Sequence, residues 1–439
     1  MLAKAAKPLV KLVDRYLPDP YIFVLLLSLV VLLAAVIVEQ QTPLEVINYW
    51  GAGFWSLLSF SMQMLLVLVT GFMLASSPPV KKLLDRLAGF AKSAPQAIVL
   101  ITVVSLVASW INWGFGLVVG ALFAKALARK IRVDYRLLVA SAYSGFVVWH
   151  GGLAGSIPLT IATPGHFSEA EIGIIATSET IFAGFNLTIL AILLLVMPLV
   201  NRFMLPEEKD SVYVEPHQLD DSEARVADKQ SQDRPADKLE NSRLLAWSIG
   251  GAGLAYLAYY FLVNTGSLNL NLVNFLFLFV AIILHQTPRS LLNSLNEAIK
   301  GGAGIVIQFP FYAGIMAVMM QSGLAQSISE GFVSIASAES LPFLSFISAG
   351  IVNIFVPSGG GQWAVQAPIM LPAAEALGAD VARVAMAVAW GDAWTNLIQP
   401  FWALPVLAIA GLKARDIMGF CLVQLIITGV IISIGLSWF

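Results

Sequence analysis

Charged residues, cysteine and histidine are all scarce in this chain. Of its 439 residues, 12% are charged, one is cysteine and four are histidine, whereas 58% are hydrophobic. A soluble domain carries roughly 25% charged residues. The lone cysteine excludes an intrachain disulfide and a cysteine metal site. Lys and Arg number 25 against 27 Asp and Glu, so the basic excess of a nucleic-acid-binding protein is missing. Lipid is therefore the expected surrounding of this chain, and nucleic acid is not an expected partner.

The apolar residues gather in long runs, as a polytopic membrane protein requires. A helix needs about 20 apolar residues to cross a bilayer. The basic stretch before the first run resembles a signal peptide, but it lacks a clean small-residue cleavage site, so we interpret the run as an uncleaved first helix. Two further apolar segments, 95–130 and 342–377, are each broken in the middle. We expect an all-α protein with about nine full spans, at 20–39, 53–76, 135–165, 183–203, 243–264, 268–285, 301–321, 381–411 and 416–438.

Lysine and arginine indicate which side of the membrane each loop faces. Loop 77–94 carries four of them and is assigned to the cytoplasm. Segment 95–130 leaves from this basic side and returns to a second basic stretch, so we expect a re-entrant helical hairpin. Segment 342–377 is flanked by stretches free of lysine and arginine, so we expect a hairpin that enters from outside. Five predicted spans separate the two hairpins, and an odd number makes the two halves inverted. The N-terminus is then cytoplasmic and the C-terminus periplasmic.

The two interrupted segments lie in halves of similar length. From Gly71 to Gly165 is 94 residues, and from Gly314 to Gly411 is 97. Between the halves, a polar stretch holds 11 of the 27 acidic residues and is expected to be a mostly disordered cytoplasmic linker. The expected divisions are 1–52 for the N-terminal segment and first span, 53–203 for the first repeat, 204–242 for the linker, 243–300 for connecting spans and a surface helix, and 301–439 for the second repeat.

The breaks in the two hairpins predict binding tips. Non-helical backbone at membrane depth survives only where protein, water or ligand satisfies its polar groups. We expect the second helix of the later hairpin to restart after Gly361 and to point free N–H groups at an anion. The alternative is that these glycines only permit close helix packing. The candidate substrate-binding residues at the tips are Asn112, Trp113, Gly114, Gly116, Asn353, Ser358, Gly359, Gly360, Gly361 and Gln362.

Two broken spans carry the other candidates. A mid-span carboxylate such as Asp392 costs about 3 kcal/mol on insertion scales, so it is a candidate sodium ligand or proton carrier. A hydrogen-bonded structural role is the alternative. His150 either binds a substrate carboxylate, relays a proton, or is a satisfied interior histidine. The candidate cation-coupling residues are Asp392, Thr395, Asn396 and Gln399, with sodium at the first three, and the further candidate substrate contacts are Trp149, His150, Ser156 and Trp390.

Several motifs resemble the bacterial short-chain fatty acid transporters of the AtoE type. They are Leu17–Pro20, Ile111–Gly120, Gln308–Gly314, Val356–Gly361 and Gln399–Pro405. The resemblance implies inner-membrane uptake of small monocarboxylates such as acetoacetate and butyrate. It also implies a place in the ion transporter superfamily, whose better-described members are dimers that work as elevators with two hairpins in a mobile transport domain. It assigns no binding residue.

The expected function is secondary active uptake of a short-chain monocarboxylate with a proton or sodium ion. We expect a homodimer, no enzyme activity and no cofactor other than a coupling sodium ion. A hydroxy acid, a dicarboxylate or an amino acid is the competing substrate, although a dicarboxylate needs a second anion site and neither tip holds an arginine. The remote alternative is an intramembrane acyltransferase or hydrolase that uses His150 and Ser156, for which no matching acid is evident.

Overall fold

The computed structural model describes residues 20–215, 219, 234–264 and 266–438, and this part of the chain is helical and has no strand. The expected all-α fold is therefore confirmed. The helices of the first half are α2 (Pro20–Ile37), α3 (Pro43–Gly53), α4 (Leu58–Ser76), α5 (Pro78–Ala88), α6 (Ala94–Ile111), α7 (Trp113–Ala128), α8 (Tyr135–Ser144), η1 (Gly145–Gly151), α9 (Ser156–Ile161), α10 (Glu169–Ile172), α11 (Gly184–Phe203) and η2 (Glu208–Asp210). Those of the second half are α12 (Pro235–Glu240), α13 (Arg243–Leu262), α14 (Leu270–His285), α15 (Pro288–Ala298), η5 (Ile299–Gly302), α16 (Ala303–Ser322), α17 (Leu324–Ile335), α18 (Leu341–Val352), α19 (Gly359–Leu377), α20 (Val381–Thr395), η6 (Asn396–Ile398), α21 (Pro400–Ala410) and α22 (Ala414–Trp438).

Several helices have the length and apolar composition of membrane spans. Over the described residues there are seven of them, or eight if the bent pair α20 and α21 counts as one. Two of the nine expected spans instead form shorter apolar helices, Tyr21–Ile37 and Leu270–His285. Conversely α6, which was expected to be a hairpin arm, is long enough to count as a span. The chain is therefore a multi-pass membrane protein, while the number nine is not reproduced.

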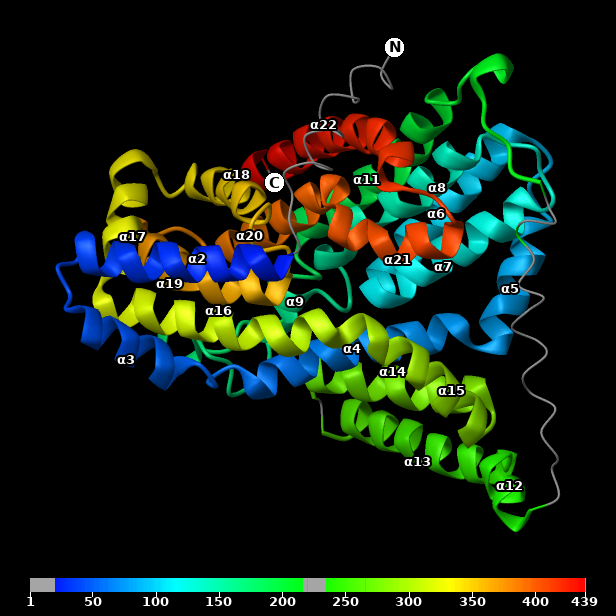
Figure 1. Cartoon of the computed structure of the whole chain (residues 1–439), viewed down its shortest axis with the longest axis horizontal. Coiled ribbons are helices and arrows are strands. Elements are labelled where there is room, and N and C mark those ends of the chain that lie inside the picture. The colour runs from blue at the N-terminus through cyan, green and yellow to red at the C-terminus, as the bar shows by residue number, and fades with distance from the viewer. Residues whose placement is uncertain (1–19, 216–218, 220–233, 265, 439) are drawn as a thin grey trace.

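The two halves repeat the same order of elements. In the first half α4 packs on α7, and in the second half the corresponding α16 packs on α19. Likewise α6 packs on α8 and η1, as α18 packs on α20. The helices that precede each half pack on the other half. α2 and α3 lie on either side of α16, whereas α14 and α15 pack on α4, and α13 is outermost on α14 (Figure 1). This reciprocal packing brings the two halves into one body with α20 near its centre.

Both predicted hairpins are helix pairs that turn at the expected residues. Asn112 ends α6 and caps α7 with an extended backbone, φ −159° and ψ 131°. Ser358 caps α19 with φ −156° and ψ 107°. The expectation that this helix restarts after Gly361 is wrong, because α19 already begins at Gly359. The reason is the cap: the Ser358 hydroxyl accepts the Gly361 N–H, which satisfies a donor at the helix start.

The described ends of the polar linker are anchored to the helices. On one side, Asp134 caps α8 and also accepts the backbone N–H of Val212 at 2.7 Å. On the other side, Arg289 of α15 donates to Asp237 of α12 at 2.8 Å. The predicted disorder concerns mainly residues 216–218 and 220–233, which lie outside the described part of the chain. The linker therefore docks at both described ends rather than only connecting the halves.

Replacing Asp134 by alanine should free the first end of the linker. We expect Asp134→Ala to lose about 1 kcal/mol of cap energy and to speed tryptic cleavage after Lys209 severalfold, since local opening governs proteolysis. Asp380→Ala is the matched control, because Asp380 caps α20 in the second half by accepting the Arg383 N–H at 3.2 Å. Equal cleavage rates in the two variants, measured in detergent on the purified proteins, would show that Asp134 does not hold the linker.

Candidate functional site

A histidine and a carboxylate meet at the centre of the protein. The 3₁₀ helix η1 places His150 against α20, where its Nε2 lies 3.3 Å from Oδ1 of Asp392. Neither side chain is exposed to solvent. The same Oδ1 accepts the Asn396 side-chain N–H at 3.0 Å. Nδ1 and Nε2 of His150 and Oδ2 of Asp392 form no hydrogen bond among the described residues, so the 3.3 Å contact is a close approach of the two groups and not an aligned hydrogen bond. The sequence singled out these two residues separately, and the fold pairs them.

The side-chain amide of Asn353 donates hydrogen bonds to the oxygens next to this pair. Its Nδ2 donates to the Asp392 carbonyl at 3.0 Å, and to Thr395 Oγ1 and Asn396 Oδ1 at 2.9 Å each. The backbone carbonyl fixes the orientation of the amide, because it can only accept. Gln399 in turn donates to the Asn353 carbonyl at 2.7 Å. Of the three side chains proposed from sequence as sodium ligands, Thr395 and Asn396 therefore direct their oxygens at an N–H group, while the Asp392 carboxylate faces His150.

Tyr143 closes this network from α8. Its hydroxyl donates to the carbonyls of Asn396 and Gln399, the latter at 3.3 Å. Tyr143 was not among the site residues predicted from the sequence. Unwound backbone follows α20, and buried carbonyls there need donors. Tyr143 supplies one from the other half of the chain, so the break after Thr395 is held in shape by both halves.

The tip of the second hairpin lies directly on His150. A Cβ atom added at Gly359 would stand 2.2 Å from Nε2 of His150 and 2.8 Å from the Trp149 ring. A Cβ added at Gly360 would stand 2.7 Å from the Phe60 ring, and one added at Gly361 would stand 2.5 Å from the Tyr312 ring. None of the three has a positive φ. These glycines therefore serve close approach of the tip to its surroundings and not an unusual backbone conformation.

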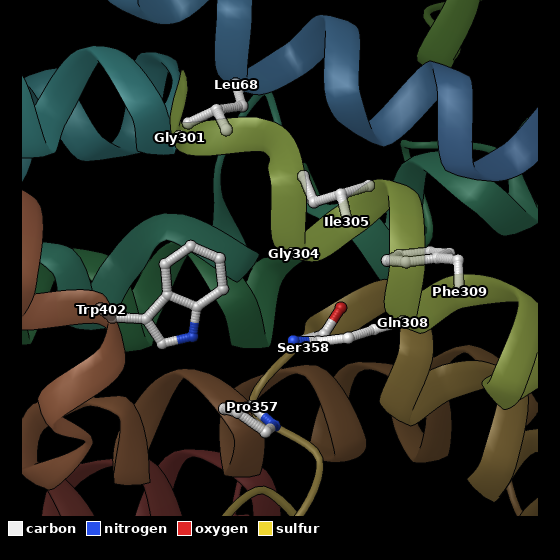
Figure 2. A pocket seen from close by; sticks show the side chains of 9 residues that line it. All are labelled: Leu68, Gly301, Gly304, Ile305, Gln308, Phe309, Pro357, Ser358 and Trp402. Carbon is white, nitrogen blue, oxygen red and sulfur yellow. The ribbon is translucent and has the colours of Figure 1, made fainter. Parts of the chain in front are cut away.

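A pocket lies beside this tip, at Pro357 and Ser358 (Figure 2). Its polar groups are Ser358 at the tip and Gln308 on α16, and none of its lining residues is charged. Gln308 is 5% exposed, and its Oε1 accepts from the Tyr312 hydroxyl at 3.3 Å. Figure 2 shows the Gln308 amide pointing into the pocket beside Ser358. The remaining lining residues are Leu68, Gly301, Gly304, Ile305, Phe309, Pro357 and Trp402.

A row of aromatic rings joins this pocket to the first hairpin and to His150. Trp402, in the pocket wall, contacts Trp113 at the first tip with ring centroids 5.3 Å apart. Trp113 lies 5.9 Å from Trp149, which stacks on Phe146 at 5.5 Å. Both tips and the buried pair thus share one aromatic wall. Such a wall can hold an apolar tail without competing for hydrogen bonds.

Several predicted site residues are engaged in helix packing instead. Gln362 donates to the Ala349 carbonyl at 2.9 Å, and the Trp390 indole donates to Asn186 at 3.0 Å. At the first tip, the Asn112 side chain caps Phe115 and donates to the Val67 carbonyl, while Cβ atoms on Gly114 and Gly116 would strike Leu68 and Ser109 at 3.0 Å and 2.2 Å. Ser156 is buried at the start of α9, and within the described residues no hydrogen bond joins it to His150.

The sequence interpretation missed most of the pocket. Gln308 and Phe309 were noted only as part of a family motif, and Leu68 and Ile305 not at all. One signal was available: Gln308 is a polar residue in an apolar helix just before Pro310. A buried amide in a membrane helix needs a partner, which marks a polar site. The apolar walls gave no such signal, because they are ordinary membrane-helix residues.

Comparisons with known proteins agree along the whole chain. A family described as "Short chain fatty acid transporter" matches residues 1–439. A protein of Escherichia coli (strain K12) named "Putative short-chain fatty acid transporter" is 46% identical over 441 residues and covers 100% of both chains. A protein of the same name from Haemophilus influenzae is 44% identical over 446 residues and covers 99% of both.

Two solved structures share the fold. The Alcanivorax borkumensis YdaH transporter has a TM-score of 0.56 at 15% identity, over 96% of this chain and 97% of that one. Neisseria gonorrhoeae MtrF, described with a class of antimetabolite efflux pumps, has a TM-score of 0.52 at 16% identity, over 97% of each. These identities support the fold alone. The match of the family and of two full-length relatives shows that the chain belongs to the short chain fatty acid transporter family.

Proposed function

We propose that this chain is a secondary active transporter that takes up short-chain monocarboxylates, such as acetoacetate and butyrate, across the bacterial inner membrane together with a cation. The observation that carries this proposal is the pocket at the tip of the second hairpin. It offers the Ser358 hydroxyl at the N-cap of α19 and the Gln308 amide, together with aliphatic and aromatic walls. One carboxylate and a short tail match these polar groups and walls.

The chemistry of the pocket favours a small monoanion. Neutral donors and a helix N-terminus bind a carboxylate without a paired cation. A dicarboxylate would bring a second charge to a lining that holds no lysine or arginine. The apolar walls should discriminate weakly between chain lengths, because each buried methylene contributes about 0.8 kcal/mol. Selectivity among short acids is therefore expected to be broad.

The repeated architecture fits alternating access. The two halves have the same element order and exchange their preceding helices, which supports an inverted repeat with hairpins entering from opposite sides. An elevator movement of the hairpin-bearing part, a homodimer, a cytoplasmic N-terminus and a periplasmic C-terminus belong to this proposal.

A hydroxy acid or amino acid is the second candidate substrate, since Gln308 and Ser358 could also pair with a hydroxyl or ammonium group. A hydrolase is disfavoured, because the Nε2 of His150 faces Asp392 and not a nucleophile.

The role of the pocket can be tested by changing its polar groups. Gln308→Leu keeps the volume and removes the amide, and Ser358→Ala removes the hydroxyl. A hydrogen bond to a charged group contributes about 1.5–3 kcal/mol, so each variant should raise the KM for butyrate uptake by about tenfold or more. Gln326→Leu on the exposed face of α17 is the matched control and should leave KM unchanged. Normal KM values in both pocket variants, measured in proteoliposomes at equal reconstitution, would place the substrate elsewhere.

A further inference from the structure

We propose that His150 and Asp392 form one proton-binding site, and that Gly359 links the occupancy of this site to carboxylate binding in the neighbouring pocket. The proposal rests on the transport function proposed above and assigns its coupling ion. The coupling cation is then a proton rather than sodium, and both partners that hold it are identified.

The geometry of the pair is that of a site with room for a second proton. With one proton between them, the imidazole and the carboxylate are neutral overall, which is the state that a fully buried site favours. Both ring nitrogens of His150 and Oδ2 of Asp392 remain without a hydrogen bond in the described structure. A purely structural pair would be expected to satisfy these buried atoms. Three unsatisfied polar atoms on one buried acid–base pair are therefore better explained by function.

The surrounding groups favour a proton over sodium. Sodium needs several oxygens directed at one point, but Thr395 Oγ1, Asn396 Oδ1 and the Asp392 carbonyl are directed at the Asn353 amide nitrogen. Tyr312 of α16 interacts electrostatically with Asp392, and a phenol is neutral at ordinary pH. Within the described part of the chain, Asp392 forms no ion pair with a lysine or arginine, so no fixed positive charge there competes with protonation.

Gly359 provides the physical connection. It follows Ser358, which lines the pocket, and its Cα lies so close to His150 that a Cβ would reach Nε2 at 2.2 Å. A carboxylate bound at Ser358 is thus separated from the imidazole by the width of one glycine. The attraction between the bound anion and a protonated His150 is strong in a buried site. Carboxylate binding should draw a proton onto the pair, and a protonated pair should strengthen carboxylate binding by the same factor.

The charges balance in this cycle. The empty transporter carries one proton on the pair and is neutral there. The loaded transporter carries the carboxylate, with charge −1, and a second proton that brings the pair to +1, so the site is again neutral. Both forms can cross the membrane barrier without a net charge, and release of the carboxylate on the other side returns the second proton with it. The transport is then electroneutral symport of one carboxylate and one proton.

Proton uptake on butyrate binding tests this directly. The purified full-length protein in weakly buffered detergent solution is mixed with butyrate, and a pH-sensitive dye reports protons while tryptophan fluorescence reports binding. We expect about one proton to be taken up per bound butyrate. The apparent affinity for butyrate should fall as the pH rises, by up to about tenfold per pH unit in the range where the pair titrates. His150→Gln should bind butyrate more weakly and take up no linked proton, because its remaining carboxylate is already protonated at rest. His166→Gln, which replaces a half-buried loop histidine, is the matched control and should behave as wild type.

A second pair of variants keeps the test informative if His150→Gln does not fold. Gly359→Ala should lower the ratio of protons to bound butyrate, since its methyl group pushes the tip away from His150. Gly331→Ala, where a Cβ meets nothing within 4 Å, should keep the ratio. Full proton uptake in His150→Gln or in Gly359→Ala would overturn the proposal, as would butyrate binding that requires sodium and releases or takes up no proton. Absence of any butyrate binding in the wild type would overturn the proposed function itself.

Discussion

Replacing Gly391 by valine should abolish accumulation of folded protein in the membrane. A Cβ at this position would lie 2.3 Å from the Phe346 carbonyl and 2.6 Å from Cβ of Ala349, both on α18. The nearest obstacle is backbone, which cannot rotate away as a side chain can. Helix α18 and α20 pack against each other over their length, so the strain cannot be relieved locally. A substitution that overpacks a buried helix contact and collides with backbone is one of the rare changes that lower the free energy of unfolding by more than about 4 kcal/mol.

The control for this prediction is a glycine of another membrane helix. A Cβ on Gly251 of α13 meets nothing within 4 Å, and the residue is exposed at the surface of the helix. Gly251→Val should therefore be extracted in normal yield and elute as a single species in size-exclusion chromatography. Normal yield and thermal stability of Gly391→Val would mean that α18 and α20 do not approach as closely as described.

The second large effect is expected at the hairpin tip, and there on function rather than on folding. Gly360→Val should lower the affinity for substrate by the order of a hundredfold, because misplacing a site by about 1 Å can have an effect of that size. Its side chain would strike the Phe60 ring, which stands 2.7 Å from the added Cβ. Phe60 in turn contacts Phe309 at 5.7 Å, and Phe309 lines the pocket. The tip, α4 and the pocket wall are therefore displaced together.

Insertion of Gly360→Val should remain normal, since the obstacle is a ring edge and not backbone. The measurement is butyrate affinity from tryptophan fluorescence on protein that passes size-exclusion chromatography, with Gly251→Val again as the control. Wild-type affinity in Gly360→Val would show that the tip is a packing element only. That was the alternative interpretation of the glycines from the sequence.

The main elements of the fold are readable from the sequence because membrane helices have a strong compositional signal. The breaks at Asn112 and before Gly359 were predicted from glycine and proline, and both hairpins are present. The start of α19 was misplaced by three residues because glycines suggest an open loop, whereas the Ser358 cap lets them form a first helical turn. Span counting was less accurate, because α2 and α14 fall below the usual length.

The candidate site was only partly predictable. His150 and Asp392 were recognised individually as costly buried polar groups, but their pairing depends on η1 crossing α20, which no local pattern reveals. Thr395, Asn396 and Gln399 were interpreted as cation-coupling residues, whereas the fold directs the first two at the Asn353 amide and uses Gln399 to satisfy a carbonyl. Pocket walls such as Leu68 and Ile305 look like any lipid-facing residue in sequence. Their role follows from the crossing of α4 and α16.

Uptake of radiolabelled butyrate into proteoliposomes, with the pH gradient and the sodium gradient imposed separately, tests the central claim most directly. Protein-free vesicles set the background, because a protonated short-chain acid also crosses lipid unaided. We predict saturable accumulation above that background when the interior is more alkaline, no effect of sodium, and loss of the driven component in His150→Gln but not in His166→Gln. Accumulation that follows only the sodium gradient would contradict the assignment of the coupling site. Absence of saturable uptake under either gradient would contradict the proposed transport of short-chain monocarboxylates.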